Sequence, residues 1–266
     1  MIIMLQAEII SVGREVLRGF TVNTNASWLA QQLISLGIDV KRITVVDDEE
    51  NDIINITNET LKRKPHIIIY TGGLGPTFDD ITVESVAKAL NIPLEINNIA
   101  LDMLKKVFEK LKLPLTDERI KMAKMPIGAI PLPNSVGTAP GVFLVFNETI
   151  IIMLPGVPDE MKSIFIESVK PRLTELSGRG TYLEKLFITR GIPESEASRV
   201  VKEIKKQFKL IYIKSHPRGY TENKPTLLFQ LSYLGEDKRN AEIELENAFK
   251  ILKTRLIDLG AKIEED

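Results

Sequence analysis

The chain has 266 residues, of which 44% are hydrophobic, and a formal net charge of −1. This length predicts one large domain or two ordinary ones, with enough buried surface to fold without a disulfide. The near-zero charge gives no electrostatic argument for nucleic-acid binding, and the absence of cysteine excludes disulfides, thiolate nucleophiles and zinc–thiolate sites.

Predicted strands and helices alternate through the first third of the chain. The strands are expected at Ala7–Val12, Ile38–Val46 and His66–Thr71, and the helices at Asn23–Leu36, Asp47–Lys64 and Val83–Leu90. This alternation is typical of a parallel sheet covered by helices on both faces, and such sheets bind ligands beyond the carboxyl ends of their strands. We therefore expect Glu15, Asp47 and the loop after Thr71 to lie at one rim.

A glycine-rich loop, Gly72-Gly73-Leu74-Gly75-Pro76-Thr77-Phe78-Asp79-Asp80, follows the third strand. Its glycines allow backbone N–H groups to approach an anion, and the helix that follows directs its positive end at the same place. The loop is neither a Walker loop nor a dinucleotide fingerprint. Bare carboxylates beside a phosphate repel it, so Asp79 and Asp80 indicate a bridging metal ion or proton transfer. The alternative is that one of them only caps the helix.

The middle of the chain continues with helices at Asn98–Leu111 and Thr116–Met125. An ordered, irregular loop is expected over Pro126–Gly141, followed by a β-hairpin of Val142–Phe146 and Thr149–Leu154. A second glycine–proline turn, Pro155–Pro158, then leads into a helix at Asp159–Val169. This turn offers either another anion-facing helix start or only a strand-to-helix connection.

A polar stretch at Pro171–Tyr182, with Ser177-Gly178-Arg179-Gly180 at its centre, predicts a domain boundary. The expected domains are residues 1–170 and 171–266. In the second, the expected order is a strand, a helix, two strands and a helix, at Glu184–Arg190, Glu194–Gln207, Leu210–Ser215, Thr226–Tyr233 and Asp237–Leu259. This order predicts a small α+β domain of ferredoxin-like type.

The segment Lys214–Tyr220 of the second domain is expected to be a glycine–proline turn that carries Lys, His, Arg and Tyr side chains. Its cations either help to hold a phosphate at the glycine loop of a partner subunit, or are solvated charges on a hairpin connection. The sequence leaves both interpretations open.

Several motifs occur one after another along the chain. They are Gly13-Arg14-Glu15, Asn23-Thr24-Asn25, Thr71 to Asp80, Gly137-Thr138-Ala139-Pro140-Gly141 and Leu154-Pro155-Gly156-Val157-Pro158-Asp159-Glu160-Met161. In this order the sequence is similar to the amino-terminal region of the CinA (competence-damage-inducible) family, which itself resembles the molybdopterin-binding fold of MoaB and MogA. The likeness covers about the first two thirds of the chain, and the small domain more loosely.

The resemblance implies an α/β fold: a three-layer α/β/α domain with a mostly parallel sheet, in a homo-oligomer, with a dimer favoured. It implies a ligand that carries phosphate and a metal-dependent pyrophosphohydrolase, which cleaves ADP-ribose to AMP and ribose 5-phosphate with Mg, Mn or Co. The alternatives are binding or adenylylation of a pterin phosphate in molybdenum cofactor biosynthesis, and a non-catalytic nucleotide-binding module.

The expected site combines the resemblance with the rim argument. Glu15, Asp47 and Asp80 are the expected catalytic residues, and Asp79 and Asp80 the expected metal ligands. The expected phosphate- or nucleotide-binding residues are Gly13, Asn23, Asn25, Thr71, Gly72, Gly73, Leu74, Gly75, Pro76, Thr77, Gly137, Thr138, Ala139, Gly141, Pro155 and Gly156.

Two residues depart from the family pattern. Arg14 stands where Asp or Asn is usual and adds a positive charge to the rim, and Val46 replaces the usual Gly or Pro before Asp47. The deamidase domain of full-length bacterial CinA proteins is not expected, nor are nicotinamide mononucleotide deamidation, haem or flavin. Met1–Leu5 is too short for a signal peptide and no apolar run reaches about 20 residues, so a cytoplasmic protein without membrane contact is expected.

Overall fold

A computed structural model describes residues 4–177, 181–235 and 238–264. The chain divides into two compact units, unit 1 with Met1–Leu33 and Ile38–Ser177, and unit 2 with Ile34–Gly37 and Gly178–Asp266. Gly178–Gly180 of the expected boundary and Asp237 of the expected last helix lie outside the described residues.

The centre of unit 1 is a six-stranded sheet of order β2-β1-β3-β8-β7-β6. The strands are β1 (Gln6–Val12), β2 (Asp39–Val46), β3 (Ile67–Thr71), β6 (Ile130–Leu132), β7 (Gly141–Phe146) and β8 (Thr149–Leu154). Strands β2, β1, β3 and β8 run parallel, while β7 and β6 are antiparallel to their neighbours. Every residue of β3 is buried, as a continuous β-branched run in a parallel sheet requires. The expected mostly parallel sheet and its hairpin are confirmed.

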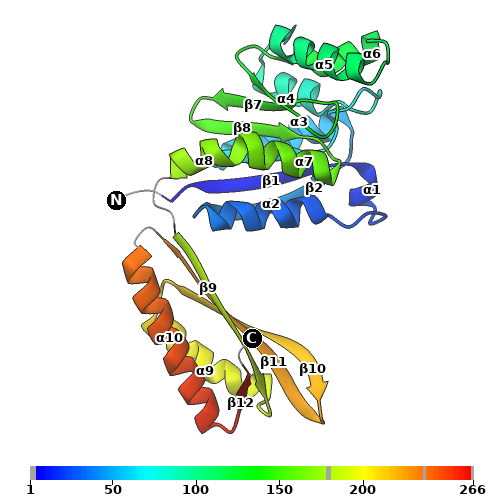
Figure 1. Ribbon diagram of the computed structural model, residues 1–266. Helices are drawn as coiled ribbons and strands as arrows, with labels where there is room; N and C mark the ends of the chain where they lie inside the picture. The colour runs from blue at the N-terminus through cyan, green and yellow to red at the C-terminus, as the bar shows by residue number, and fades with distance from the viewer. Residues whose placement is uncertain (1–3, 178–180, 236–237, 265–266) are drawn as a thin grey trace. The chain divides into compact units, whose positions relative to one another are not determined.

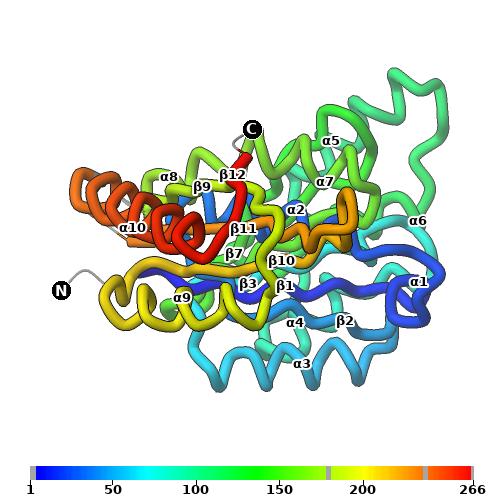
Figure 2. Tube along the Cα trace, turned by 90° about the horizontal axis from the view of Figure 1, so that it is seen from below, coloured from blue at the N-terminus to red at the C-terminus, as the bar shows by residue number. Residues whose placement is uncertain are grey.

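Helices cover both faces of this sheet (Figures 1 and 2). On one face lie α2 (Thr24–Ser35), α7 (Pro158–Ile164), a π-helical turn (Phe165–Val169) and α8 (Lys170–Ser177). The Trp28 ring of α2 meets Phe165 edge-on, with 5.4 Å between ring centroids. On the other face lie α3 (Glu50–Lys62) and α4 (Thr82–Leu90), and α5 (Asn98–Lys110) shares one buried core with them and the sheet. These three layers are the expected α/β/α architecture.

Three expected elements of unit 1 are wrong in extent. The helix expected over Thr116–Met125 is only α6 (Asp117–Ile120) and a 3-10 turn (Lys121–Ala123). The chain then becomes β5 (Lys124–Pro126), because that segment pairs with β4 (Leu94–Ile96). The loop expected to be irregular contains β6, and the polar stretch from residue 171 is helical to Ser177 as α8.

One expected helix start is also wrong, and so is the alternative in which Asp79 or Asp80 caps a helix. Helix α3 begins at Glu50 rather than Asp47, because Asp47 is bound by Arg14 of the short helix α1 (Arg14–Leu17). Helix α4 has Ile81 at its N-cap, so neither Asp79 nor Asp80 caps it. The helix α2 start and end follow the expected pattern: the Asn23 side chain accepts a hydrogen bond from the Ala26 N–H (3.2 Å), and Gly37 follows the end with a φ of 75°.

Unit 2 is a four-stranded antiparallel sheet of order β10-β11-β9-β12, with helices α9 and α10 packed into its core. Its elements follow the order βαββαβ: β9 (Thr181–Arg190), α9 (Glu194–Gln207), β10 (Ile211–Thr221), β11 (Lys224–Gly235), α10 (Lys238–Asp258) and β12 (Lys262–Glu264). The expected ferredoxin-like type is confirmed, although the sequence missed β12.

The segment Lys214–Tyr220 is not a turn, which corrects the prediction. It is part of β10, and the chain reverses only at Glu222–Asn223, where φ is 52° and 60°. Two positive φ values in a two-residue connection match the twist of a hairpin. No helix among the described residues is both long and apolar enough to cross a membrane.

Candidate functional site

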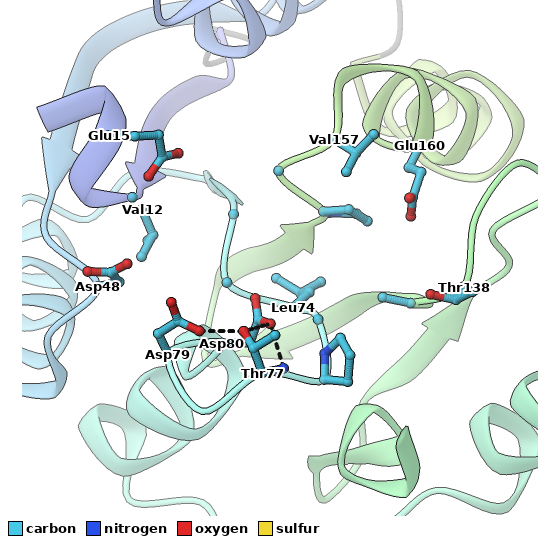
Figure 3. Close-up of a pocket in the computed structure, with 18 residues that line it drawn as sticks. Val12, Glu15, Asp48, Leu74, Thr77, Asp79, Asp80, Thr138, Val157 and Glu160 are labelled. Carbon is cyan, nitrogen blue, oxygen red and sulfur yellow. Dashed lines mark hydrogen bonds between the residues drawn. The ribbon is translucent and has the colours of Figure 1, made fainter. Parts of the chain in front are cut away.

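A cavity of about 430 Å³ lies at the carboxyl ends of β1, β3 and β8 (Figure 3). Its lining comes from the strand ends, the glycine loop and the start of α7. The lining residues are Val12, Gly13, Glu15, Asp48, Gly72, Gly73, Leu74, Gly75, Pro76, Thr77, Asp79, Asp80, Thr138, Ala139, Pro155, Gly156, Val157 and Glu160. Most residues expected at the rim thus converge on one cavity, in the place where parallel sheets bind ligands.

The first two glycines of the loop are required by the protein's own packing. Gly72 has a φ of 109°, and a Cβ there would meet the Val12 carbonyl oxygen at 2.1 Å. Gly73 has a φ of 69°, and its Cβ would meet Thr82 Oγ1 at 2.3 Å. That hydroxyl donates a hydrogen bond to the Gly72 carbonyl (2.7 Å) and ties the loop to α4. These glycines therefore let the loop pack against β1 and α4, a need that exists without any ligand.

The same loop leaves donors free at the cavity. The backbone N–H groups of Gly73, Leu74 and Gly75 donate to no acceptor among the residues that the structure describes, whereas the Gly72 N–H donates to the Leu154 carbonyl (3.0 Å). The Leu74 side chain is buried in the core and anchors the loop. Consecutive free amides on a fixed backbone form the kind of concavity that binds an anion.

Thr77 organises the two carboxylates at the end of the loop. Its N–H and its hydroxyl both donate to Asp80 Oδ2, at 2.9 and 2.6 Å, and the hydroxyl also contacts Asp79 Oδ1. The Thr77 hydrogen bond holds the pKa of Asp79 below its usual value. Asp79 is therefore charged at neutral pH, and Asp80 is fixed by the loop rather than by a helix cap.

Asp47 and Asp48 occupy different environments although they are adjacent. Arg14 Nε donates to Asp47 Oδ1 (2.8 Å), and Arg14 Nη2 donates to Glu49 Oε1 (2.7 Å). The Arg14 hydrogen bond lowers the pKa of Asp47, whereas burial, and then the neighbouring Asp47, raises the pKa of Asp48. Asp48 lines the cavity and Asp47 does not. The sequence did not single out Asp48, although Asp48 lies next to Asp47 just after the same strand.

Asn23 and Asn25, from the motif Asn23-Thr24-Asn25, make hydrogen bonds at the ends of neighbouring strands. Asn25 Nδ2 donates to Thr71 Oγ1 (3.0 Å) and to the Gly156 carbonyl (2.7 Å), and the Thr71 hydroxyl donates to the Pro155 carbonyl (3.0 Å). Asn23 accepts from the Ser11 hydroxyl as well as capping α2. Asn23, Asn25 and Thr71 line a smaller adjoining pocket of about 100 Å³. Their contacts hold the ends of β3 and β8 together beneath the main cavity.

Glu160 closes the opposite side of the cavity and was also missed, although it lies within a quoted motif. Asn134 Nδ2 donates to Glu160 Oε2 (2.6 Å), and a Cβ at Gly137 would overlap the Glu160 carboxyl group at 2.0 Å. Gly137 therefore makes room for Glu160 and does not line the cavity, whereas Thr138 and Ala139 do. Gly141 lies in β7, also outside the lining, where a Cβ would meet Ile164 of α7 at 3.1 Å.

The cavity is strongly acidic. Its carboxylates are Glu15, Asp48, Asp79, Asp80 and Glu160, and no Lys or Arg of the described chain lines it. Figure 3 shows Glu15 and Asp48 on one side, Asp79 and Asp80 at the loop, and Glu160 on the other side. Among the described residues, no three His, Asp or Glu side chains converge as a ready metal site. A phosphate here thus needs a counter-charge that the lining does not supply.

Comparisons with known proteins give a consistent result. A family model described as a probable molybdopterin-binding domain matches residues 8–175. A protein of Sulfurisphaera tokodaii is 44% identical over 257 residues, covering 97% of each chain, and one of Pyrobaculum arsenaticum is 44% identical over 253 residues, covering 95% and 94%. A crystal structure of CinA from Thermoplasma acidophilum, described as a protein of unknown function, is 40% identical. It matches with a TM-score of 0.59 and covers 63% of this chain and 98% of its own.

Proposed function

The chain belongs to the family of probable molybdopterin-binding domains through residues 8–175, and from this premise we propose that its acidic cavity binds a pterin or nucleotide phosphate together with a divalent cation. The observation that supports this most strongly is that Gly73, Leu74 and Gly75, whose N–H groups donate to no acceptor in the described part of the chain, line a cavity at the carboxyl ends of parallel strands.

The cation is part of the proposal because of the surrounding charge. A phosphate alone is repelled by the carboxylates of the lining, and Mg²⁺ commonly binds through one or two carboxylates plus the phosphates of its ligand. The carboxylates of the lining fit such a cation, because Mg²⁺ takes oxygen ligands. Asp79 and Asp80 are placed to hold it, since only one oxygen of each carboxylate contacts Thr77. When bound, the cation supplies neutralisation of charge on the phosphate oxygens.

Catalysis at the same cavity is the second part of the proposal. Asp48 has a raised pKa and lines the cavity beside Glu15, so these two carboxyl groups are the candidates for moving a proton. If water is the nucleophile, it attacks one phosphorus of ADP-ribose, loses its proton to the base and breaks the bridging P–O bond, which yields AMP and ribose 5-phosphate. If a pterin phosphate attacks the α-phosphorus of ATP, the products are the adenylylated pterin and diphosphate.

The test separates binding from each reaction. The chain would be incubated with ADP-ribose, with ATP, and with ATP plus a pterin phosphate, each at millimolar Mg²⁺, Mn²⁺ or Co²⁺, and the products would be resolved by chromatography. AMP from ADP-ribose supports the pyrophosphohydrolase, and diphosphate release that requires the pterin supports adenylyl transfer. Calorimetric binding without turnover supports a binding protein. If no ligand binds at any metal, the proposal is wrong.

A further inference from the structure

A second pocket of about 570 Å³ adjoins the acidic cavity. The two share Glu15, Asp48 and Asp79, so they are continuous along the rim. The lining of this second pocket also includes Phe20 and Phe78, which come from the segment after α1 and from the glycine loop. The pocket is therefore composed differently from the cavity, which is lined by glycines and carboxylates.

The two phenylalanines are unusual in this chain. Phe20 is 81% exposed and Phe78 is 92% exposed, whereas every other phenylalanine of the chain is buried or half-buried. An exposed aromatic ring contributes little to the core, and two of them lining one pocket form an apolar surface that marks a binding site. Leu74 and Thr77, which precede Phe78 in the same loop, have partners by contrast: Leu74 packs in the core and Thr77 hydrogen-bonds Asp80.

We propose that this pocket, the ring pocket, binds the planar heteroaromatic ring of the ligand whose phosphates occupy the acidic cavity. This inference rests on the proposed function and specifies how its ligand is recognised. The faces of Phe20 and Phe78 stack on a purine or pterin ring, which is an interaction that any flat heterocycle can make. Arg14 and Arg18 lie at the same pocket as donors for the ring edge, and Arg14 is held in place by Asp47 and Glu49.

A ring fits this pocket better than a second copy of the chain does. The pocket lining has four carboxylates and only two guanidinium groups, so a protein partner that covered Phe20 and Phe78 would also take unmatched negative charge out of water, which is costly. A heterocycle covers the two rings and leaves these carboxylates facing the phosphate side of the same ligand. The continuity of the two pockets therefore favours one ligand that spans both.

The experiment compares ligands that share a triphosphate and differ in the ring. Calorimetric titrations with ATP, dihydroneopterin triphosphate and inorganic tripolyphosphate, all with Mg²⁺, would be run on the native chain, Phe20→Ala and Phe78→Ala. Ile99→Ala is the matched control, because Ile99 is a 62% exposed apolar residue on α5, outside both pockets. We expect each phenylalanine variant to bind at least one ring-bearing ligand about tenfold more weakly than the native chain does. Tripolyphosphate binding should change less than twofold.

Three results would contradict the ring pocket. Equal loss for ATP, the pterin and tripolyphosphate would show a general disturbance of the loop. Unchanged binding of every ligand in both variants would show that the rings are not contacted. If Phe78→Ala bound every ligand as the native chain does but formed a smaller assembly in sedimentation, this would show that a second copy of the chain covers this surface. Failure of the native chain to bind any of the three would instead overturn the proposed function, and the ring pocket with it.

Discussion

Two segments of this chain, 71–80 in unit 1 and 214–221 in unit 2, share a kind of composition and differ in structure. Both place charged and hydroxyl side chains around glycine and proline. The first follows a buried parallel strand and ends in a cavity with free amides, whereas the second is an edge strand paired with β11. Its side chains also have local partners, since Ser215 donates to Glu194 (2.9 Å) and His216 hydrogen-bonds Gln230 (3.1 Å).

The comparison shows that composition alone does not identify a site. Parallel strands end side by side and leave the loops that follow them without ladder partners, so donors and carboxylates gather there. In an antiparallel hairpin the next strand takes up the same backbone groups. The predictions below test this contrast, from the largest expected effect to the smallest.

The largest expected effect is on stability, from one glycine in each segment. In Gly72→Ala the new Cβ would lie 2.1 Å from the Val12 carbonyl oxygen, so we expect a loss of about 3 kcal/mol or more. In Gly219→Ala, where φ is 83° and no atom lies within 4 Å, the loss should be about 1–2 kcal/mol. Urea unfolding followed by Trp28 fluorescence reports unit 1, and far-UV circular dichroism reports both units. Equal losses of stability in the two variants would contradict the claim that Gly72 is required by its packing against Val12.

The next effect is on binding. Asp80→Asn keeps an acceptor for Thr77 and removes a charge, so unfolding should change by less than about 1 kcal/mol. Binding of Mg²⁺·ATP should weaken about 10- to 100-fold if this carboxylate holds the cation. Glu194→Gln is the control in unit 2, where the carboxylate that accepts from Ser215 should have no effect on binding. Unchanged affinity in Asp80→Asn would remove Asp80 from the cation site.

A smaller effect concerns pH. Because Arg14 lowers the pKa of Asp47 below its ordinary 3.8, this carboxyl stabilises the fold above that pH and loses its contribution as the pH falls through the folded-state pKa. The native chain should therefore lose stability in acid more steeply than Arg14→Gln. The raised pKa of Asp48 changes stability with pH in the opposite direction. Asp47→Asn is therefore measured as a second variant, because it removes the titration of Asp47 itself. Parallel stability curves for the native chain and both variants, measured by Trp28 fluorescence, would disprove the Arg14 assignment.

The smallest expected effect is in unit 2. Arg218→Ala should leave ligand binding within twofold of native and stability within about 0.5 kcal/mol, because Arg218 lies on an exposed part of β10. Calorimetry with Mg²⁺·ATP measures the first and urea unfolding the second. A tenfold loss of affinity would instead support the interpretation in which these cations hold a phosphate at a partner's glycine loop.

The sheet and most helices of unit 1 could be predicted because their patterns are local. The buried run of β3, the Asn23 cap and Gly37 each follow from a few neighbouring residues. Strand β12 could not, because three residues with one apolar side chain carry no pattern and pair only through their contact with β9. The helix expected at Thr116–Met125 failed similarly, since pairing with β4 overrides local preference.

That the expected residues gather at one edge of the sheet could also be predicted, but the contacts of each side chain could not. Strand ends and glycines pointed to the rim. Asp48 lines the cavity and Asp47 does not, and Arg14, which binds Asp47 from 33 positions away, also lies 3.5 Å from Asp48. Gly137 and Glu160 are likewise distant in sequence and meet only in the folded chain. Side-chain partners at this range leave no periodic signal, so the sequence pointed to the loops that line the cavity but not to Asp48 and Glu160.

The central claim is that the free amides of the glycine loop bind a phosphate. Hydrogen–deuterium exchange of the native chain, with and without saturating Mg²⁺·ATP or Mg²⁺·dihydroneopterin triphosphate, measures those amides directly. We predict fast exchange at Gly73, Leu74 and Gly75 in the free chain and slower exchange on binding, with no change in 211–221 of unit 2. Slower exchange confined to unit 2, or bound ligand that leaves these three amides unprotected, would contradict the account.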